Sequence, residues 1–139
     1  MKLPMKSRKR FLKKLSTWTT IFLVVFISSC GFAYEKHVIG KYYIIGVDTK
    51  DDLSLSYNLG NGDYIGKAPG RILQYGFDDT VLVAKTQEAH KANPSYYVID
   101  MRKDSGAALE ETFRIGPLDE NEYLNGWHPK LHIQLRNAK

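Results

Sequence analysis

The sequence predicts an α+β domain: an antiparallel β-meander of five to seven strands with one short helix packed on it. Three observations lead to this fold class. Runs rich in β-branched and aromatic residues fill most of the chain after residue 37, and some of them alternate apolar with polar residues. Clusters of Gly, Asn, Asp and Pro separate these runs, as turns require. One segment near the C-terminus has the acidic start and glycine end that are typical of a helix.

The first two runs are expected to form an antiparallel hairpin. Residues 38–47, VIGKYYIIGV, consist largely of strand-forming side chains. Residues 53–59, LSLSYNL, alternate strictly, with leucine and tyrosine on one face and serine and asparagine on the other. This pattern is typical of a half-buried strand. The polar residues 48–52 between the runs predict the turn of the hairpin.

The middle of the chain is expected to continue the meander. Further strands are predicted at residues 64–66, 71–77, 80–87 and 96–101. Turns rich in Gly, Asn or Asp precede the first three of them at residues 60–63, 68–70 and 77–79, and a loop covers residues 88–95.

The pattern changes toward the C-terminus. Residues 106–116 fit either a short helical turn or a strand. Residues 116–126 predict the short helix, because Pro117 suits a first helical turn, acidic residues follow it, and Gly126 is a plausible C-terminal stop. Residues 130–135, KLHIQL, alternate again and predict a last strand.

We expect one globular domain over residues 38–139, preceded by a tether over residues 30–37. A domain of this size buries roughly two-thirds of the surface that its unfolded chain exposes. The predicted core consists of aliphatic residues from the strands: Val38, Ile39, Ile44, Ile45, Val81, Leu82, Val83, Val98, Ile99, Leu131 and Ile133.

The first 29 residues have the three zones of a secretory signal peptide. Residues 1–15 are basic, residues 18–27 form an apolar run, and the small residues Ser28 and Ser29 follow. A membrane-spanning helix needs about 20 apolar residues, so this run is short for an anchor.

The basic charge of the chain belongs to this leader. Seven of the 20 Lys and Arg residues precede Cys30 and no acidic residue does, which leaves 13 basic against 15 acidic residues after it. The exported part is therefore close to neutral. This distribution argues against a nucleic-acid-binding protein, because the positive charge does not belong to the folded domain.

Cys30 is the only cysteine, and it stands directly after the leader. The segment Ile27-Ser28-Ser29-Cys30 resembles the lipobox of bacterial lipoproteins, although Ser29 replaces the Gly or Ala that is commoner before the cysteine. The resemblance implies a diacylglyceryl group, with fatty acids such as palmitate, on the Cys30 thiol and cleavage by a dedicated peptidase just before Cys30. Two acyl chains anchor a protein stably to a membrane. Two alternative interpretations of Cys30 stay open. It could be an unmodified thiol in a signal peptide that is cleaved elsewhere, or part of an anchor helix that is not removed.

A second export motif overlaps the leader. Residues 7–13, SRKRFLK, resemble the twin-arginine export motif except at Lys9, where the second arginine belongs. Lysine lacks the planar fork of arginine, so this departure is not neutral. The alternative is the general secretion route. Gly31, which is not the aspartate that retains some lipoproteins at the inner membrane, favours the outer membrane in a cell that has two.

Few residues suggest a catalytic or metal-binding role. His128 and His132 would share a metal on a helix, but the predicted strand separates positions four apart by about 13 Å. Adjacent Asp78 and Asp79 are interpreted as turn residues rather than as an acid–base pair. We therefore predict no catalytic residue, no metal site and no cofactor.

The nine tyrosines all follow Cys30, and two of their pairs are adjacent, Tyr42 with Tyr43 and Tyr96 with Tyr97. Strand alternation sends one member of each pair to each face, so some tyrosines are expected to stay exposed. Exposed tyrosine is favoured at binding surfaces. The alternative explanation is the high strand propensity of tyrosine.

Three segments, GFDDTVLVAKTQ, YYVID and GPLDENEY, resemble a family of small bacterial lipoproteins with no known catalytic residues. That resemblance covers residues 38–135 and implies a β-meander with a helix after Gly-Pro-Leu. We expect a monomeric, lipid-anchored cell-envelope protein that acts as a non-enzymatic binding or inhibitor module for an envelope protein. The alternatives are a structural accessory of envelope assembly and an enzyme whose site the linear sequence hides.

We predict that Cys30→Ala leaves a slowly processed precursor without acyl chains, because the thiol is the only attachment point. Mass spectrometry of the wild-type chain and the variant from membranes tests this. Wild-type protein that is cleaved normally but lacks acyl mass would contradict the lipoprotein assignment.

Overall fold

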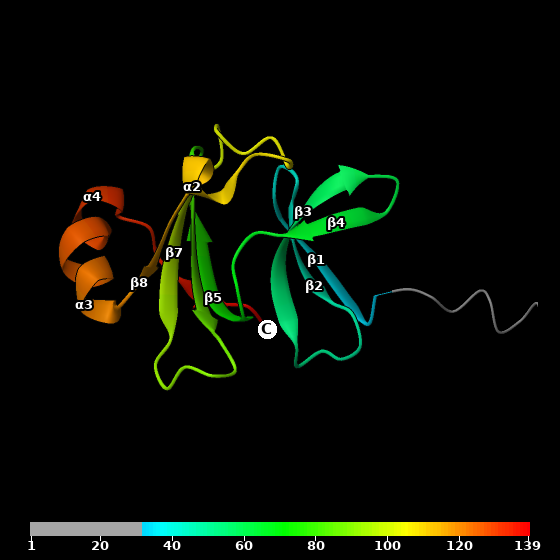
Figure 1. The fold of residues 1–139 in the computed structure, drawn as a ribbon, viewed down its shortest axis with the longest axis horizontal. Helices are drawn as coiled ribbons and strands as arrows, with labels where there is room; N and C mark the ends of the chain where they lie inside the picture. The colour runs from blue at the N-terminus through cyan, green and yellow to red at the C-terminus, as the bar shows by residue number, and fades with distance from the viewer. Residues whose placement is uncertain (1–31) are drawn as a thin grey trace, which may run out of the picture. The chain divides into compact units, whose positions relative to one another are not determined.

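The computed structural model describes residues 32–139, so the predicted signal peptide and Cys30 lie outside the described residues. Two antiparallel sheets and a helical segment over residues 120–131 form three layers, with the second sheet in the middle (Figure 1). The predicted β-rich character with few short helices is confirmed. The prediction of one meander is wrong, because the strands divide into two sheets that face each other across the main core.

The first sheet has the order β1-β2-β3-β4. Its strands are β1 (Tyr34–Ile39), β2 (Tyr42–Gly46), β3 (Leu53–Gly60) and β4 (Asp63–Gly66). The hairpin of β2 and β3 confirms the predicted pairing. The single strand predicted at residues 38–47 is wrong, because Gly40, with φ of 56°, turns the chain between β1 and β2. β1 also takes up part of the segment predicted as a tether.

The second sheet has the order β8-β7-β6-β5-β9. Its strands are β5 (Arg71–Phe77), β6 (Val81–Gln87), β7 (Ser95–Asp100), β8 (Arg114–Leu118) and β9 (Arg136–Asn137). The chain leaves the first sheet after Gly66 and enters the second through residues 67–70. Pro69 cannot donate to a strand ladder, and Gly70 has φ of 80°. The meander is interrupted at this connection.

The part of the chain after β7 differs most from its prediction. α2 (Glu110–Phe113) is a single turn, and it leads directly into β8, so residues 106–116 contain both predicted alternatives. Pro117 lies in β8 instead of starting a helix, which an edge strand tolerates. The next helix begins at Glu120 instead, where Asp119 and Glu122 form a capping box.

This helix also continues past its predicted end. α3 (Glu120–Glu122), a π-helical turn η1 (Tyr123–Trp127) and α4 (His128–Leu131) follow one another without a break. Gly126 lies inside η1, and the helix ends at His132, whose φ is 53°. The strand predicted at residues 130–135 is therefore wrong. The apolar residues of that run pack on the second sheet from a helical turn and an irregular segment.

Two hydrophobic clusters hold the three layers together. The larger cluster lies between the sheets and includes Ile44 and Leu55 from the first sheet and Leu82 and Ile99 from the second. The smaller cluster joins the second sheet to the helical segment through Val83, Val98, Tyr96, Tyr123 and Ile133. The second sheet is thus covered on both faces, whereas the first is covered by these clusters on one.

Most predicted core residues are buried. Val38, Ile39, Val81 and Leu131 are only partly buried, because they lie toward the margins of the two clusters. Leu59 shares the alternating pattern of β3 but is 51% exposed, since it lies next to the turn that joins β3 to β4.

We predict that Gly76→Ala lowers the free energy of unfolding by about 1–3 kcal/mol, the usual cost of overpacking. A Cβ on Gly76 in β5 would come within 2.5 Å of the Gln134 carbonyl oxygen and of a methyl group of Ile133. Urea denaturation measures the change. Gly66→Ala in β4 is the matched control, because its Cβ would meet nothing within 4 Å. Equal effects of the two substitutions would contradict the packing of residues 133–134 on β5.

Candidate functional site

The structure places the two histidines on one helical turn. His128 is the first residue of α4 and His132 is its left-handed C-cap, and the His132 N–H donates to the His128 carbonyl oxygen at 3.0 Å. The strand that was expected to separate them is therefore absent, and the argument from strand spacing does not apply. Within residues 32–139, no group of three or more His, Cys, Asp or Glu side chains is arranged to hold a metal ion. The lack of a metal site stays a prediction.

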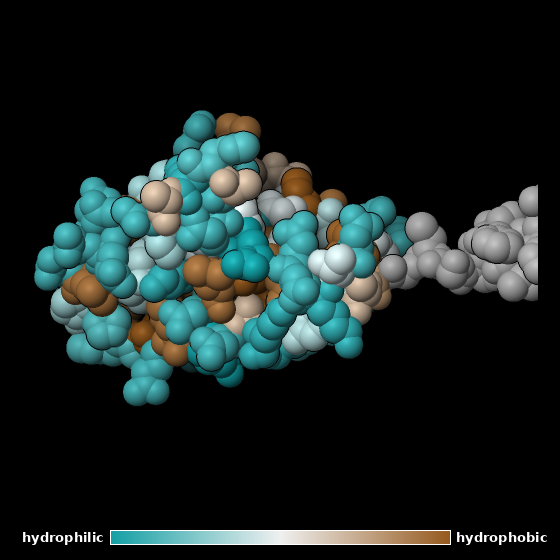
Figure 2. All heavy atoms as spheres, turned by 90° about the horizontal axis from the view of Figure 1, so that it is seen from below, coloured by the Kyte–Doolittle hydropathy of each residue, from teal (hydrophilic) through white to brown (hydrophobic). Residues whose placement is uncertain are grey.

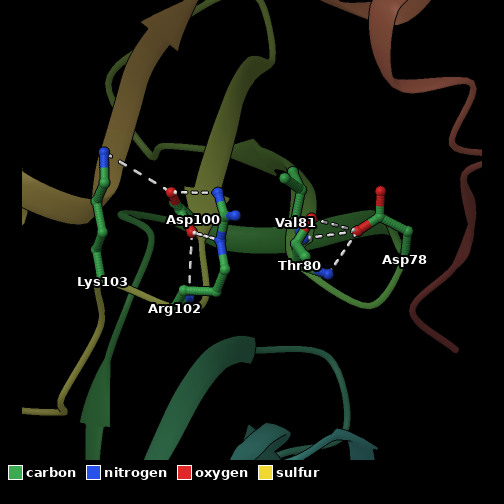
Figure 3. A network of polar contacts seen from close by, with 6 residues as sticks. All are labelled: Asp78, Thr80, Val81, Asp100, Arg102 and Lys103. Carbon is green, nitrogen blue, oxygen red and sulfur yellow. Dashed lines mark hydrogen bonds and ion pairs between the residues drawn. The ribbon is translucent and has the colours of Figure 1, made fainter.

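Asp78 and Asp79 have different environments. One carboxylate oxygen of Asp78 accepts hydrogen bonds from the backbone N–H groups of Thr80 and Val81, both at 2.7 Å, and from the Thr80 hydroxyl at 3.2 Å (Figure 3). These bonds, the Thr80 N–H first among them, hold the pKa of Asp78 below its usual value. Asp79 is exposed. The interpretation of this pair as part of a turn agrees with these contacts.

A second turn lies beside the first. Asp100, at the end of β7, accepts two hydrogen bonds from the Arg102 guanidinium, at 3.0 and 3.1 Å, and Lys103 lies 3.7 Å away (Figure 3). The Arg102 side chain lowers the pKa of Asp100. The Met101 N–H donates to the Thr80 carbonyl oxygen at 2.9 Å and joins the two turns. We interpret this network as support for the ends of β5, β6 and β7.

The outer face of the first sheet carries a row of four rings. The side chains of Phe32, Tyr64, Tyr43 and His37, in this order, form what is called here the aromatic row. Their ring centroids lie 5.1, 5.5 and 5.0 Å apart from one ring to the next. Register places three of these rings on one face, because His37 is paired with Tyr43, Tyr43 with Ser56, and Tyr64 with Asn58, two residues along β3 from Ser56.

Small neighbours and polar contacts hold the aromatic row in place. Ser56 lies on β3 between the strands of Tyr43 and Tyr64, and its short side chain leaves room for the two rings to meet. The Tyr64 hydroxyl donates to Glu35 at 2.8 Å, and this contact raises the pKa of Tyr64. The Nε2 atom of His37 forms a hydrogen bond with the Gly40 carbonyl oxygen at 2.9 Å. Phe32 is 39% exposed, His37 is exposed, and the two tyrosines are half-buried.

The tyrosine pairs follow the predicted alternation with different results. Tyr42 points into the core while Tyr43 points to the outer face. Tyr96 and Tyr97 also point to opposite faces of their sheet, but both are buried, because the helical segment covers the second face. Half-exposed tyrosines therefore occur only at positions 34, 43 and 64, all of them on the first sheet.

A buried ionic cluster lies between the two sheets. The Lys67 ammonium group is 2.7 Å from Asp104, and their side chains are 2% and 0% exposed. Lys67 also donates to the Gly106 carbonyl oxygen at 3.1 Å, and its Nζ faces the rings of Tyr57 and Phe113 at 5.0 and 4.5 Å. The ammonium group is thus surrounded by acceptors and aromatic faces.

Asp104 is equally well enclosed. Its Oδ1 accepts from the Gly106 N–H at 2.8 Å, and its Oδ2 accepts from the Tyr42 hydroxyl at 2.8 Å. Burial, together with this carboxylate, raises the pKa of Tyr42 well above its usual value, so Tyr42 stays a hydrogen-bond donor. Removing one partner of such a buried pair leaves an uncompensated charge, which is strongly destabilising.

Some hollows of the surface are lined entirely by residues outside the aromatic row. One groove of about 500 Å³ lies beside β5 and β9, and its charged lining residues are Arg71, Lys85, Lys139 and Asp51. Asp51 is already paired with Lys139. Figure 2 shows one face of the domain, where apolar patches are scattered among mainly hydrophilic side chains.

The comparisons with known proteins give no family for this chain. No family model, no curated protein and no solved structure matches it. The resemblance to bacterial lipoproteins therefore stays a prediction from residues 1–31 and from the three segments of the domain. Among the helices of residues 32–139, none has the length and apolar character to cross a membrane.

The sequence predicts neither the aromatic row as a unit nor the buried ionic cluster. It indicates exposed tyrosines, but it contains no signal for their partners Phe32 and His37. Lys67 and Asp104 are 37 positions apart and each lies next to a turn, where a charged residue is normally solvated. The local sequence contains no signal for their burial.

We predict that Asp78→Ala lowers the free energy of unfolding by about 1 kcal/mol at neutral pH, through loss of hydrogen bonds to the carboxylate. Because the folded-state pKa of Asp78 is lowered, this stabilisation is present at neutral pH and is lost as the pH falls through that pKa. The difference between wild type and variant should therefore shrink in acid. Asp79→Ala is the matched control and should change stability little. Urea denaturation at pH 7 and at about pH 3 measures both.

Proposed function

We propose that this chain is a lipid-anchored protein of the cell envelope, and that its folded domain is a non-enzymatic binding module for another envelope protein. The observation that carries the proposal is the aromatic row on the outer face of the first sheet. The leader and Cys30 support the anchoring, and the aromatic row supports the binding.

Several physical features favour binding at this face. Tyrosine offers a large contact area at a low cost in conformational entropy, and it is enriched among the residues that dominate protein interfaces. The ring-to-ring contacts and the Tyr64–Glu35 hydrogen bond order the row before any partner arrives. Such preorganisation lowers the entropic cost of association. The flanking polar residues Glu35, Ser54 and Asn58 would provide a polar rim.

The position of the first strand restricts the partner. β1 begins at Tyr34, four positions after Cys30. Four residues span at most about 14 Å when extended, so a lipid on Cys30 would hold the domain close to the membrane surface. The partner is therefore expected to be an integral membrane protein or a protein at the membrane surface.

We predict that a photo-crosslinking amino acid at position 37 in living cells captures a defined protein adduct, whereas the same amino acid at position 124 does not. His37 ends the aromatic row, and Leu124, 45% exposed, lies in the helical segment. Gel shift and mass spectrometry of the adducts measure the outcome.

The variant that tests the row is Tyr43→Thr combined with Tyr64→Thr, which keeps strand-forming residues but removes two rings. The adduct at position 37 should fall about 10-fold or more, as expected for loss of interface hot spots. Leu109→Ser with Leu124→Ser is the control for lost exposed apolar surface elsewhere. Adducts that contain only lipid, or adducts that the tyrosine variant does not change, would contradict a protein-binding face.

A further inference from the structure

We infer that Lys67 and Asp104 become joined by an intramolecular isopeptide bond, which forms between the lysine Nζ and the aspartate Cγ with loss of one water molecule. This inference does not depend on the proposed binding function. It rests on the contacts of the buried ionic cluster, which place an amine and a carboxyl group together with their surroundings.

The reacting groups are already in contact. The Lys67 Nζ is 2.7 Å from Asp104 Oδ1, and Cγ is one covalent bond further. The Nζ–Cγ distance is therefore at most about 4 Å, compared with the separation of about 3–3.5 Å that is typical of reacting atoms in a near-attack arrangement. Lys67 follows β4 and Asp104 lies between β7 and α2, so the folded sheets hold both groups in place. Such positioning replaces an encounter in solution and accounts for a large part of many rate enhancements.

The surroundings keep water away from the two reacting groups. Both side chains are almost fully buried, and the rings of Tyr57 and Phe113 enclose Nζ. The reaction begins when one proton moves from the Nζ ammonium group to Asp104 Oδ1, which converts the ion pair into two neutral groups. The hydrogen bond from Nζ to Oδ1 is the path for this transfer, and it produces an amine with a free lone pair and a carboxylic acid protonated on Oδ1.

The bond then forms in two steps. The Nζ lone pair attacks Cγ, and negative charge develops on Oδ2, where the Tyr42 hydroxyl donates a hydrogen bond at 2.8 Å. Tyr42 thus serves as the oxyanion donor, a role in which a preorganised hydrogen bond is highly effective. A second Nζ proton passes to Oδ1, the Cγ–Oδ1 bond breaks, and water leaves. The ammonium group and the carboxylate become one amide and one water, so atoms and charge balance without any oxidant, reductant or cofactor.

The Gly106 backbone completes this arrangement. Its carbonyl oxygen accepts from Nζ at 3.1 Å and orients the amine, while its N–H donates to Oδ1, the oxygen that leaves, at 2.8 Å. A Cβ at Gly106 would lie 2.8 Å from atoms of Tyr57 and Leu59, and its φ is 87°, so glycine allows this close approach. The resulting covalent link would tie the first sheet to the connection after β7.

Peptide mapping of the full-length chain tests the inference. The protein is purified from cells, denatured and digested with trypsin. The expected product is one branched peptide, in which residues 51–71 are joined to residues 104–114 and whose mass is one water below the sum of the two. Recovery of residues 51–67, 68–71 and 104–114 as separate peptides would show an ion pair only and would overturn the inference. This measurement does not depend on the folding of any variant.

Two variants test the chemistry. Lys67→Arg keeps a cation beside Asp104 but has no nucleophilic amine, and it should give no branched peptide. Tyr42→Phe removes the oxyanion donor, and it should slow formation of the branched peptide by about 100-fold in a pulse-chase experiment. Tyr123→Phe is the matched control, because the Tyr123 hydroxyl is buried without a partner in the other hydrophobic cluster. Linkage at equal rates in all three proteins with Lys67 would overturn the role of Tyr42.

Discussion

The buried contact between Lys67 and Asp104 restricts how the two sheets can pack against each other. Lys67 follows the last strand of the first sheet, and Asp104 follows the central strands of the second. A charged pair with side chains 2% and 0% exposed is tolerated only when each charge is fully compensated. The Tyr42 hydroxyl, the Gly106 backbone and the aromatic rings around Nζ provide that compensation, so one packing of the sheets satisfies all these groups together.

The three layers also explain why the candidate binding face lies where it does. The second sheet lies between the first sheet and the helical segment, so its tyrosines serve the core. The first sheet has a core on its inner face, and its outer face carries the aromatic row. Each ring of the row contacts its neighbours on the outer face, and these contacts bury part of the surface of every ring. That arrangement keeps an apolar feature ordered while it stays available to a partner.

The strands could be predicted because apolar and polar side chains alternate along them, and this alternation is visible over a few neighbouring residues. Residues 53–59 show this, since strand pairing buried Leu53, Leu55 and Tyr57 as the pattern indicated. The predicted start and end of the helix were both wrong, because contacts with residues far away in the sequence decided them. Pro117 was accommodated at the edge of the second sheet, and Gly126 was absorbed by a π-helical turn that places Tyr123 against Tyr96, with ring centroids 4.4 Å apart. A terminator signal is weak compared with the burial of a tyrosine.

The β-rich class, most of the strands and the Asp78 turn could be predicted from the sequence alone. These features depend on periodicity, turn chemistry and composition, all of which are readable over a few neighbouring residues. Three features became visible only in the folded structure: the division of the strands into two sheets, the assembly of the aromatic row from β1, β2, β4 and Phe32, and the contact of Lys67 with Asp104. These contacts join residues far apart in the chain, and their free energy arises only when the layers pack and exclude water.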